Sequence, residues 1–223
     1  MPELIIFDFD GVIADSETLA NSVLAEVISE LGHPTTLDDS IRLYMGKRAH
    51  EVVAAIEARL DRALPVDFAA RLQKRTLDRL ERELTIIEGA QEYIRTFASI
   101  PQCIASSSSL ERLELCLRVL GLTDVFKSNV FSASQVKRGK PHPDIFLYAV
   151  QQMGIEPTCT IVIEDSVSGV QAGVAAGTTV IGLLAASHIS SGHEEQLRSA
   201  GAHHVARTFA DATNITNSLL TSF

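Results

Sequence analysis

The second half of the chain alternates short runs of β-type composition with stretches of helical periodicity. Such alternation is typical of βαβ units and predicts a parallel sheet flanked by helices. In a sheet of this kind, ligands bind beyond the carboxyl ends of the strands. The expected strands cover 102–105, 129–132, 160–163 and 179–183, the expected helices cover 88–98, 109–120, 143–153 and 167–176, and a weaker unit follows.

An apolar run near the start, Leu4-Ile5-Ile6-Phe7, ends on Asp8 and Asp10 with Gly11 directly after them. The run predicts a first strand, and a side-chain period of two would direct both acids to the same side. Neighbouring carboxylates are costly to keep ionised unless a cation or a proton compensates them, so the pair indicates a working site. A polar strand-to-helix turn is the alternative interpretation.

From residue 16 to about residue 85 the chain is predicted to contain helices only. Apolar residues recur at helical spacing from Leu19 to Leu31, in a short piece ending near Tyr44, and again over 52–60 and 68–84. The predicted fold is therefore α/β, with a Rossmann-like doubly wound parallel sheet as the core and an inserted all-helical cap domain. We expect the core to comprise 1–15 and 86–223, and the cap to comprise 16–85.

Composition excludes several classes of protein. Of the 223 residues 46% are hydrophobic, which is enough for an ordinary globular core, and the formal net charge of -9 comes without a long basic block. Nucleic acid and anionic membrane surfaces are therefore not expected as main partners. The three cysteines lack metal-ligand spacing and lie in apolar segments, which favours reduced thiols and a cytoplasmic location. Neither a signal peptide nor a transmembrane span is predicted.

Four polar segments fall at or just after predicted strand ends. Each has an ordinary explanation, because a serine run often caps a helix, a lysine often lies in a solvated loop, and an acidic pair often begins a helix. A parallel sheet would gather all four at one edge, which makes coincidence a poor explanation. The segments are Asp8-Phe9-Asp10, Ser106 to Ser109, Lys140, and Glu164-Asp165.

This combination of side chains suits phosphoryl transfer. Several carboxylates without Cys or His favour a hard divalent cation, Mg²⁺ rather than zinc. Lys140 and the Ser106 region supply donors for phosphoryl oxygens. Since the chain has no Walker-type glycine loop, a carboxylate nucleophile that attacks a bound phosphate is the simpler scheme.

These segments resemble the four motifs of the haloacid dehalogenase superfamily, in its phosphatase and phosphomutase branch. Order and spacing agree over nearly the whole chain, and the predicted helical insertion is similar to the family's cap. The β-phosphoglucomutase-like subgroup is the most similar, through the residues from Lys140 to Phe146 and from Glu164 to Gly169. The matching motifs are Asp8-Phe9-Asp10-Gly11-Val12, Ile104-Ala105-Ser106, Gly139-Lys140-Pro141 and Ile163-Glu164-Asp165-Ser166.

The resemblance implies a role for each position. Asp8 would be the nucleophile that forms an aspartyl-phosphate and a ligand of Mg²⁺. Asp10 would protonate the leaving oxygen and then activate water, while its backbone carbonyl binds the metal. Glu164 and Asp165 would complete the metal site. The phosphoryl oxygens would be held by Ser106 and Lys140, assisted by Ser107 and the amides near Gly11.

The resemblance implies a Mg²⁺-dependent phosphatase acting on a small phosphorylated metabolite, a sugar or sugar-acid phosphate. The alternative is a hexose-phosphate mutase, but the position where β-phosphoglucomutases carry a cap histidine is Ala20 in this chain. A phosphate-binding regulatory module without turnover is disfavoured, because both acids of the first motif are present. We expect a monomer or a weak homodimer.

Basic residues of the cap are the candidates for substrate specificity. Lys47 and Arg48 follow Gly46 in a predicted loop, and Lys74 and Arg75 lie on a predicted helix. Such side chains could receive a second anionic or hydroxyl-rich part of the substrate. For Lys74 and Arg75, a solvated helix face is an equally good interpretation.

Overall fold

The computed structural model describes residues 1–45 and 49–221. The chain divides into two compact units, one of Met1–Asp15 with Thr85–Phe223 and the other of Ser16–Leu84. The division lies within one residue of the predicted domain limits. Thr85 belongs with the core because its carbonyl accepts a hydrogen bond from the Asp15 amide at 3.0 Å, which joins the two chain segments at the boundary.

The core is built on a six-stranded sheet in which every neighbouring pair is parallel. The strand order is β3-β2-β1-β4-β5-β6, so β1 lies in the middle. This topology confirms the predicted α/β class. The strands are β1 (Leu4–Phe7), β2 (Gln102–Ser106), β3 (Val130–Ser132), β4 (Thr160–Glu164), β5 (Thr179–Leu183) and β6 (His204–Ala206).

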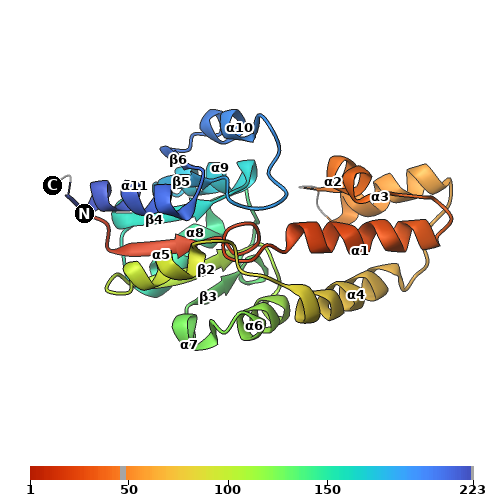
Figure 1. The fold of residues 1–223 in the computed structure, drawn as a ribbon, viewed down its shortest axis with the longest axis horizontal. Helices are drawn as coiled ribbons and strands as arrows, with labels where there is room; N and C mark the ends of the chain where they lie inside the picture. Colours follow the sequence, from red (N-terminus) through yellow and green to blue (C-terminus); the bar gives the residue numbers. More distant parts are fainter. Residues whose placement is uncertain (46–48, 222–223) are drawn as a thin grey trace. The chain divides into compact units, whose positions relative to one another are not determined.

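Helices cover both faces of the sheet (Figure 1). Leu4 and Ile6 of β1 pack into a cluster with residues of α8 and α9, whereas Phe7 contacts Tyr93 of α5 edge to face. Because both faces of β1 are covered, all four of its residues are apolar and buried. The core helices are α5 (Ala90–Thr96), α6 (Leu110–Val119), α7 (Thr123–Phe126), α8 (Asp144–Met153), α9 (Val167–Ala175), α10 (His193–Ser199) and α11 (Phe209–Thr221).

Most predicted elements agree with the structure to within one residue at each end, and the larger differences concern two helices. The helix predicted over 88–98 is only α5, since Gly89 adopts a left-handed conformation before it and the chain leaves the helix at Phe97. The four-residue α7 was not predicted, because it is too short to show helical periodicity. Two short 3₁₀ turns, Ala133–Gln135 and Pro157–Cys159, complete the core.

Helices are the only regular secondary structure among the described residues of the second unit. Its own apolar cluster includes Val23, Ile28, Tyr44, Ile56 and Phe68, which is the face expected from the apolar spacing. None of the described helices of the chain is both long and apolar enough to cross a bilayer. The helices of this unit are α1 (Glu17–Glu30), α2 (Leu37–Tyr44), α3 (Ala49–Leu60) and α4 (Phe68–Glu83).

All three cysteines are free thiols. Cys103 and Cys116 are buried in the core, and Cys159 is half-buried. Burial raises the pKa of the Cys116 thiol to about 12, although Arg112 opposes the shift. A thiol with so high a pKa is protonated near neutral pH and is a poor nucleophile, so Cys116 has a packing role.

Candidate active site

The site begins where β1 ends. Asp8 directly follows the strand, and its amide donates a 2.9 Å hydrogen bond to the carbonyl of Ile163 in β4. Its carboxylate is buried and accepts a 2.7 Å hydrogen bond from the ammonium of Lys140. Residues 132 positions apart are thereby brought into direct contact.

Lys140 lies among groups from three neighbouring strands or strand ends. Besides Asp8, its Nζ donates to Glu164 Oε1 at 2.5 Å and to the carbonyl oxygen of Ala105 at 3.3 Å. It also lies 4.9 Å from the ring centroid of Phe146, a cation–π distance. Burial lowers the pKa of Lys140, but the carboxylates of Asp8 and Glu164 outweigh this effect and raise it overall. The lysine is therefore a fixed positive charge at the carboxyl edge of the sheet.

Three buried carboxylates meet at this edge. One oxygen each from Asp8, Glu164 and Asp165 can be chosen so that all lie within 4.8 Å of one another. Burial raises the pKa of Asp8 well above its usual range; Lys140 lowers it, and the neighbouring acids raise it further. The pKa of Asp165 is also raised by burial, although a hydrogen bond from His188 opposes the shift. Lys140 balances only one of the three negative charges.

An all-oxygen donor set of this kind fits a hard divalent cation such as Mg²⁺. Asp8, Glu164 and Asp165 are the residues that could hold it, because their carboxylate oxygens are close together and need a further positive charge to remain ionised. The donor set contains no thiolate, which makes a closed structural zinc site a poorer fit. The side-chain chemistry is thus compatible with the predicted cofactor.

Two glycines make room for these carboxylates. A Cβ atom on Gly11 would overlap the carboxylate of Asp165, and one on Gly169 would overlap that of Glu164. Gly11 also has a φ of +80°, in the left-handed region that favours glycine. These positions require glycine to admit the acidic side chains, so Gly11 shapes the site sterically as well as through its backbone.

Asp10 belongs to a different polar network from Asp8. The chain turns immediately after β1, where the carbonyl of Phe9 accepts hydrogen bonds from the amides of Ile13 and Ala14. β1 ends at Phe7, so strand alternation does not by itself set the direction of the Asp10 side chain. Asp10 instead contacts Arg112 at 2.6 Å through Oδ1 and the hydroxyl of Ser108 at 2.6 Å through Oδ2.

The two serines predicted to hold phosphoryl oxygens differ in exposure. Ser106 is the last residue of β2, is buried, and its hydroxyl accepts a 3.1 Å hydrogen bond from the Ser108 amide. Ser107 is exposed. Ser106, Lys140 and Asp8 thus come from the ends of adjacent strands or the loops after them, as the parallel topology requires.

Arg112, His188 and His193 were not predicted as site residues, and Ser108 was predicted only as part of the segment Ser106 to Ser109. Ser108 and Arg112 bind Asp10, while His188 Nε2 lies 3.2 Å from Asp165 Oδ2 and His193 Nε2 lies 2.6 Å from the Asp165 carbonyl oxygen. The histidines lie in and just after the polar loop that follows β5, where sequence offered no signal. The sequence does contain a signal for Arg112, because a basic residue in the first turn of a helix interacts unfavourably with the helix dipole and therefore indicates a compensating contact.

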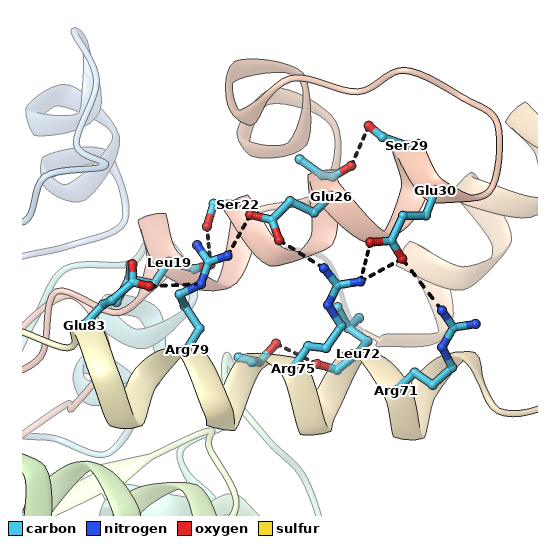
Figure 2. A network of polar contacts seen from close by, with 12 residues as sticks. Leu19, Ser22, Glu26, Ser29, Glu30, Arg71, Leu72, Arg75, Arg79 and Glu83 are labelled. Carbon is cyan, nitrogen blue, oxygen red and sulfur yellow. Dashed lines mark hydrogen bonds and ion pairs between the residues drawn. The ribbon is translucent and has the colours of Figure 1, made fainter.

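The four basic residues of the cap that were predicted to determine substrate specificity differ in what the structure shows of them. Lys47 and Arg48 lie outside the described residues. Lys74 is exposed and pairs with Asp78 at 3.0 Å, one helical turn away. Arg75 bridges α4 to α1 through Glu30 at 2.6 Å and Glu26 at 3.1 Å, within the ion-pair network shown in Figure 2. The structure thus gives Arg75 a role in joining two helices of the cap.

Comparisons with known proteins agree with this geometry. The family model for haloacid dehalogenase-like hydrolases matches residues 5–183. The 6-phosphogluconate phosphatase of Escherichia coli is 25% identical over 187 residues, which is 83% of this chain and 84% of that protein. A phosphorylated carbohydrates phosphatase of Thermotoga maritima is 33% identical over 179 residues, which is 78% of this chain and 82% of that protein.

Solved structures extend the likeness to almost the whole chain. A haloacid dehalogenase-like protein of unknown function from Agrobacterium tumefaciens is 33% identical with a TM-score of 0.87, covering 99% of this chain and 100% of the other. Similar structures also include β-phosphoglucomutase-like hydrolases. With the sheet order, the acidic cluster and the family match in agreement, the chain belongs to the haloacid dehalogenase-like hydrolases.

Proposed function

We propose that the chain is a Mg²⁺-dependent phosphatase that hydrolyses a small phosphorylated sugar or sugar acid through an aspartyl-phosphate on Asp8. The observation that carries the proposal is the contact of Asp8 with Lys140 beside Glu164 and Asp165 at the end of the central strand. A nucleophilic carboxylate, a fixed cation and a set of metal-binding oxygens are the groups that phosphoryl transfer requires. The phosphatases of Escherichia coli and Thermotoga maritima compared above act on carbohydrate phosphates, as their names state.

In the first half of the reaction, an Asp8 carboxylate oxygen attacks phosphorus and the bond from phosphorus to the ester oxygen breaks. Asp10 begins the cycle in its protonated form and gives its proton to that oxygen, so the alcohol leaves neutral. In the second half, Asp10 takes a proton from water as the water attacks phosphorus, and the bond from Asp8 to phosphorus breaks. Inorganic phosphate is released and both acids return to their starting states.

The remaining residues hold the transferring group in place. Lys140 and Ser106 would donate hydrogen bonds to phosphoryl oxygens, and Lys140 also orients Asp8 through their 2.7 Å contact. Mg²⁺ held by Asp8, Glu164 and Asp165, with the Asp10 backbone carbonyl, would neutralise negative charge on the phosphoryl group. Lys47 and Arg48 are proposed to contact the rest of the substrate, whereas Lys74 pairs with Asp78 and Arg75 with Glu26 and Glu30 of the cap.

A hexose-phosphate mutase is the second candidate, because the solved structures similar to this chain include β-phosphoglucomutase-like hydrolases. Ala20, at the position of the mutase cap histidine, argues for hydrolysis. Incubation with Mg²⁺ and a panel of sugar and sugar-acid phosphates should release inorganic phosphate. Conversion of β-glucose 1-phosphate to the 6-phosphate with a bisphosphate primer, without phosphate release, would favour the mutase.

The role of Asp8 has a direct test. Asp8→Asn keeps the size of the side chain but removes the nucleophile, so turnover should fall by at least about 10³-fold while the circular dichroism spectrum stays unchanged. Trapping with radioactive substrate should label the wild type and leave the variant unlabelled. Substantial turnover by the folded variant would remove Asp8 as nucleophile.

The proposed setting is a cytoplasmic enzyme, which the three free thiols support. We propose a monomer or a weak homodimer, which light scattering over a range of protein concentrations would test.

A further inference from the structure

Asp10 is held at both carboxylate oxygens by side chains that the family motifs do not include. The Arg112 guanidinium donates to Oδ1 and the Ser108 hydroxyl donates to Oδ2, each at 2.6 Å. The Arg112 and Asp10 side chains are 20% and 12% exposed, so water screens the ion pair less than it screens a surface pair.

The backbone at both ends of this contact is fixed. Around Asp10 the chain forms a tight turn in which the Gly11 amide donates to the Ala14 carbonyl at 2.9 Å, and Phe9 and Val12 are fully buried. At the other end, the Ser109 hydroxyl caps α6 by accepting a hydrogen bond from the Arg112 amide. With the backbone fixed at both ends, the Asp10–Arg112 contact can change mainly by rotation of these two side chains.

Ser108 is held just as firmly. Its amide donates to Ser106 Oγ at 3.1 Å, and its carbonyl accepts a 2.6 Å hydrogen bond from the hydroxyl of Ser132. The end of β2 and the end of β3 thus position the second arm of the contact. Two donors fixed on separate elements restrict the Asp10 carboxylate to one orientation.

Local preference does not explain an arginine at position 112. It is the third residue of α6, where an acidic side chain would complement the helix dipole and could complete a capping box with Ser109. An arginine at this position provides neither the favourable dipole interaction nor the capping box. The ion pair with Asp10 is the contact that compensates for this loss.

We propose that Arg112, together with Ser108, is a positioning residue that orients Asp10 for proton transfer to the leaving group. The inference rests on the proposed function, in which Asp10 is the acid and base. Proton transfer requires the donor to lie within hydrogen-bond reach of the leaving oxygen at a suitable angle. Without the two donors, Asp10 would rotate among several conformers, and fewer of them would reach that oxygen.

The test compares two substrates that differ in their need for an acid. The leaving group of a sugar phosphate is a basic alkoxide, which needs protonation. The leaving group of p-nitrophenyl phosphate is a phenolate that is stable without a proton. The ratio kcat/KM covers the steps up to the first irreversible one, so it reports leaving-group departure when phosphorylation is irreversible. For Arg112→Ala we expect kcat/KM to fall about 100-fold with the best sugar phosphate and no more than about threefold with p-nitrophenyl phosphate.

Further variants separate positioning from folding. Arg112→Lys keeps a cation and should restore part of the loss, and Ser108→Ala should give a smaller loss with the same substrate dependence. Arg118→Ala, the same change at an exposed position of α6, should leave both substrates unaffected. If Arg112→Ala does not fold, Arg112→Lys and Ser108→Ala carry the comparison.

Two results would overturn the inference. Equal losses with both substrates in folded Arg112→Ala would mean that Arg112 does not act through the acid. A rise in KM confined to sugar phosphates would mean that Arg112 binds the substrate instead. Failure of the proposed function is distinguishable, because the wild type would then cleave neither ester and Asp8→Asn would have no activity to lose.

Discussion

Asp8 and Asp10 are separated by one residue in the chain, yet they have different partners. Asp8 binds Lys140 and lies with two other buried acids, whereas Asp10 binds Arg112 and Ser108. The two acids are proposed to have different tasks, and different surroundings are the physical means of separating them. The turn that begins at Phe9 brings about this separation.

Gly11 provides a residue-scale test of that turn. Gly11→Ala should abolish most activity and weaken Mg²⁺ binding, because the added Cβ would overlap the Asp165 carboxylate and displace it. The left-handed φ adds a strain of about 1–2 kcal/mol for any residue with a Cβ. Activity and the dependence of melting temperature on Mg²⁺ are the measurements.

Gly32→Ala is the matched control. Gly32 also has a positive φ, +93°, but a Cβ there would meet no atom within 4 Å. It should therefore show the strain cost alone, with activity and Mg²⁺ response retained. If the two variants behaved alike, backbone strain rather than displacement of Asp165 would account for the effect of Gly11→Ala.

At the scale of elements, α1 and α4 of the cap are joined by ion pairs. Arg75 contacts both Glu26 and Glu30, and Arg79 contacts Glu26 at 2.8 Å (Figure 2). The Arg75 hydrogen bond lowers the pKa of Glu30 from its usual value. A carboxyl whose pKa is lower in the folded state stabilises the fold above its unfolded pKa, so this contribution is lost as the pH falls through the folded pKa.

Arg75→Ala should lower the melting temperature and leave KM unchanged, since the guanidinium is engaged with acids of α1. The difference from wild type should shrink in about 1 M NaCl, where exposed charges are screened. Lys74→Ala is the control, because Lys74 pairs only one turn along its own helix in the described contacts. A higher KM for the sugar phosphate with an unchanged melting temperature would instead assign Arg75 to substrate recognition.

For the whole molecule, the acidic cluster predicts that a metal ion stabilises the fold. After removal of metal with EDTA, activity should be lost, and added Mg²⁺ should restore it and raise the melting temperature. A ligand that binds only the folded state at 100 times its Kd contributes about 2.7 kcal/mol. Scanning calorimetry across a Mg²⁺ titration would measure this effect.

Asp165→Asn should lose the Mg²⁺ response, because it removes a negative charge from the cluster. Asp124→Asn, the same change at an exposed position of α7, should keep the response in full. Wild-type activity that survived EDTA, together with a melting temperature independent of Mg²⁺, would count against the metal site.

Much of the fold was predictable because its signals are local. Both faces of β1 are buried in apolar surroundings, so a continuous apolar run marks the strand. Parallel strands place their carboxyl ends at one edge, and this rule brought Ser106, Lys140 and Glu164 into the predicted site. The four-residue α7 was missed because one turn is too short to carry a period.

The sequence alone determined the parallel sheet, the helical insertion and the segments that form the site, since periodicity and strand ends are properties of neighbouring residues. Only the tertiary structure decided which side chain each acid binds. Arg112 reaches Asp10 across 102 positions, and His188 reaches Asp165 from the loop after β5. Such pairings depend on where helices and loops pack against the sheet, and an interaction of a few ångströms between distant residues leaves no periodic signal along the chain.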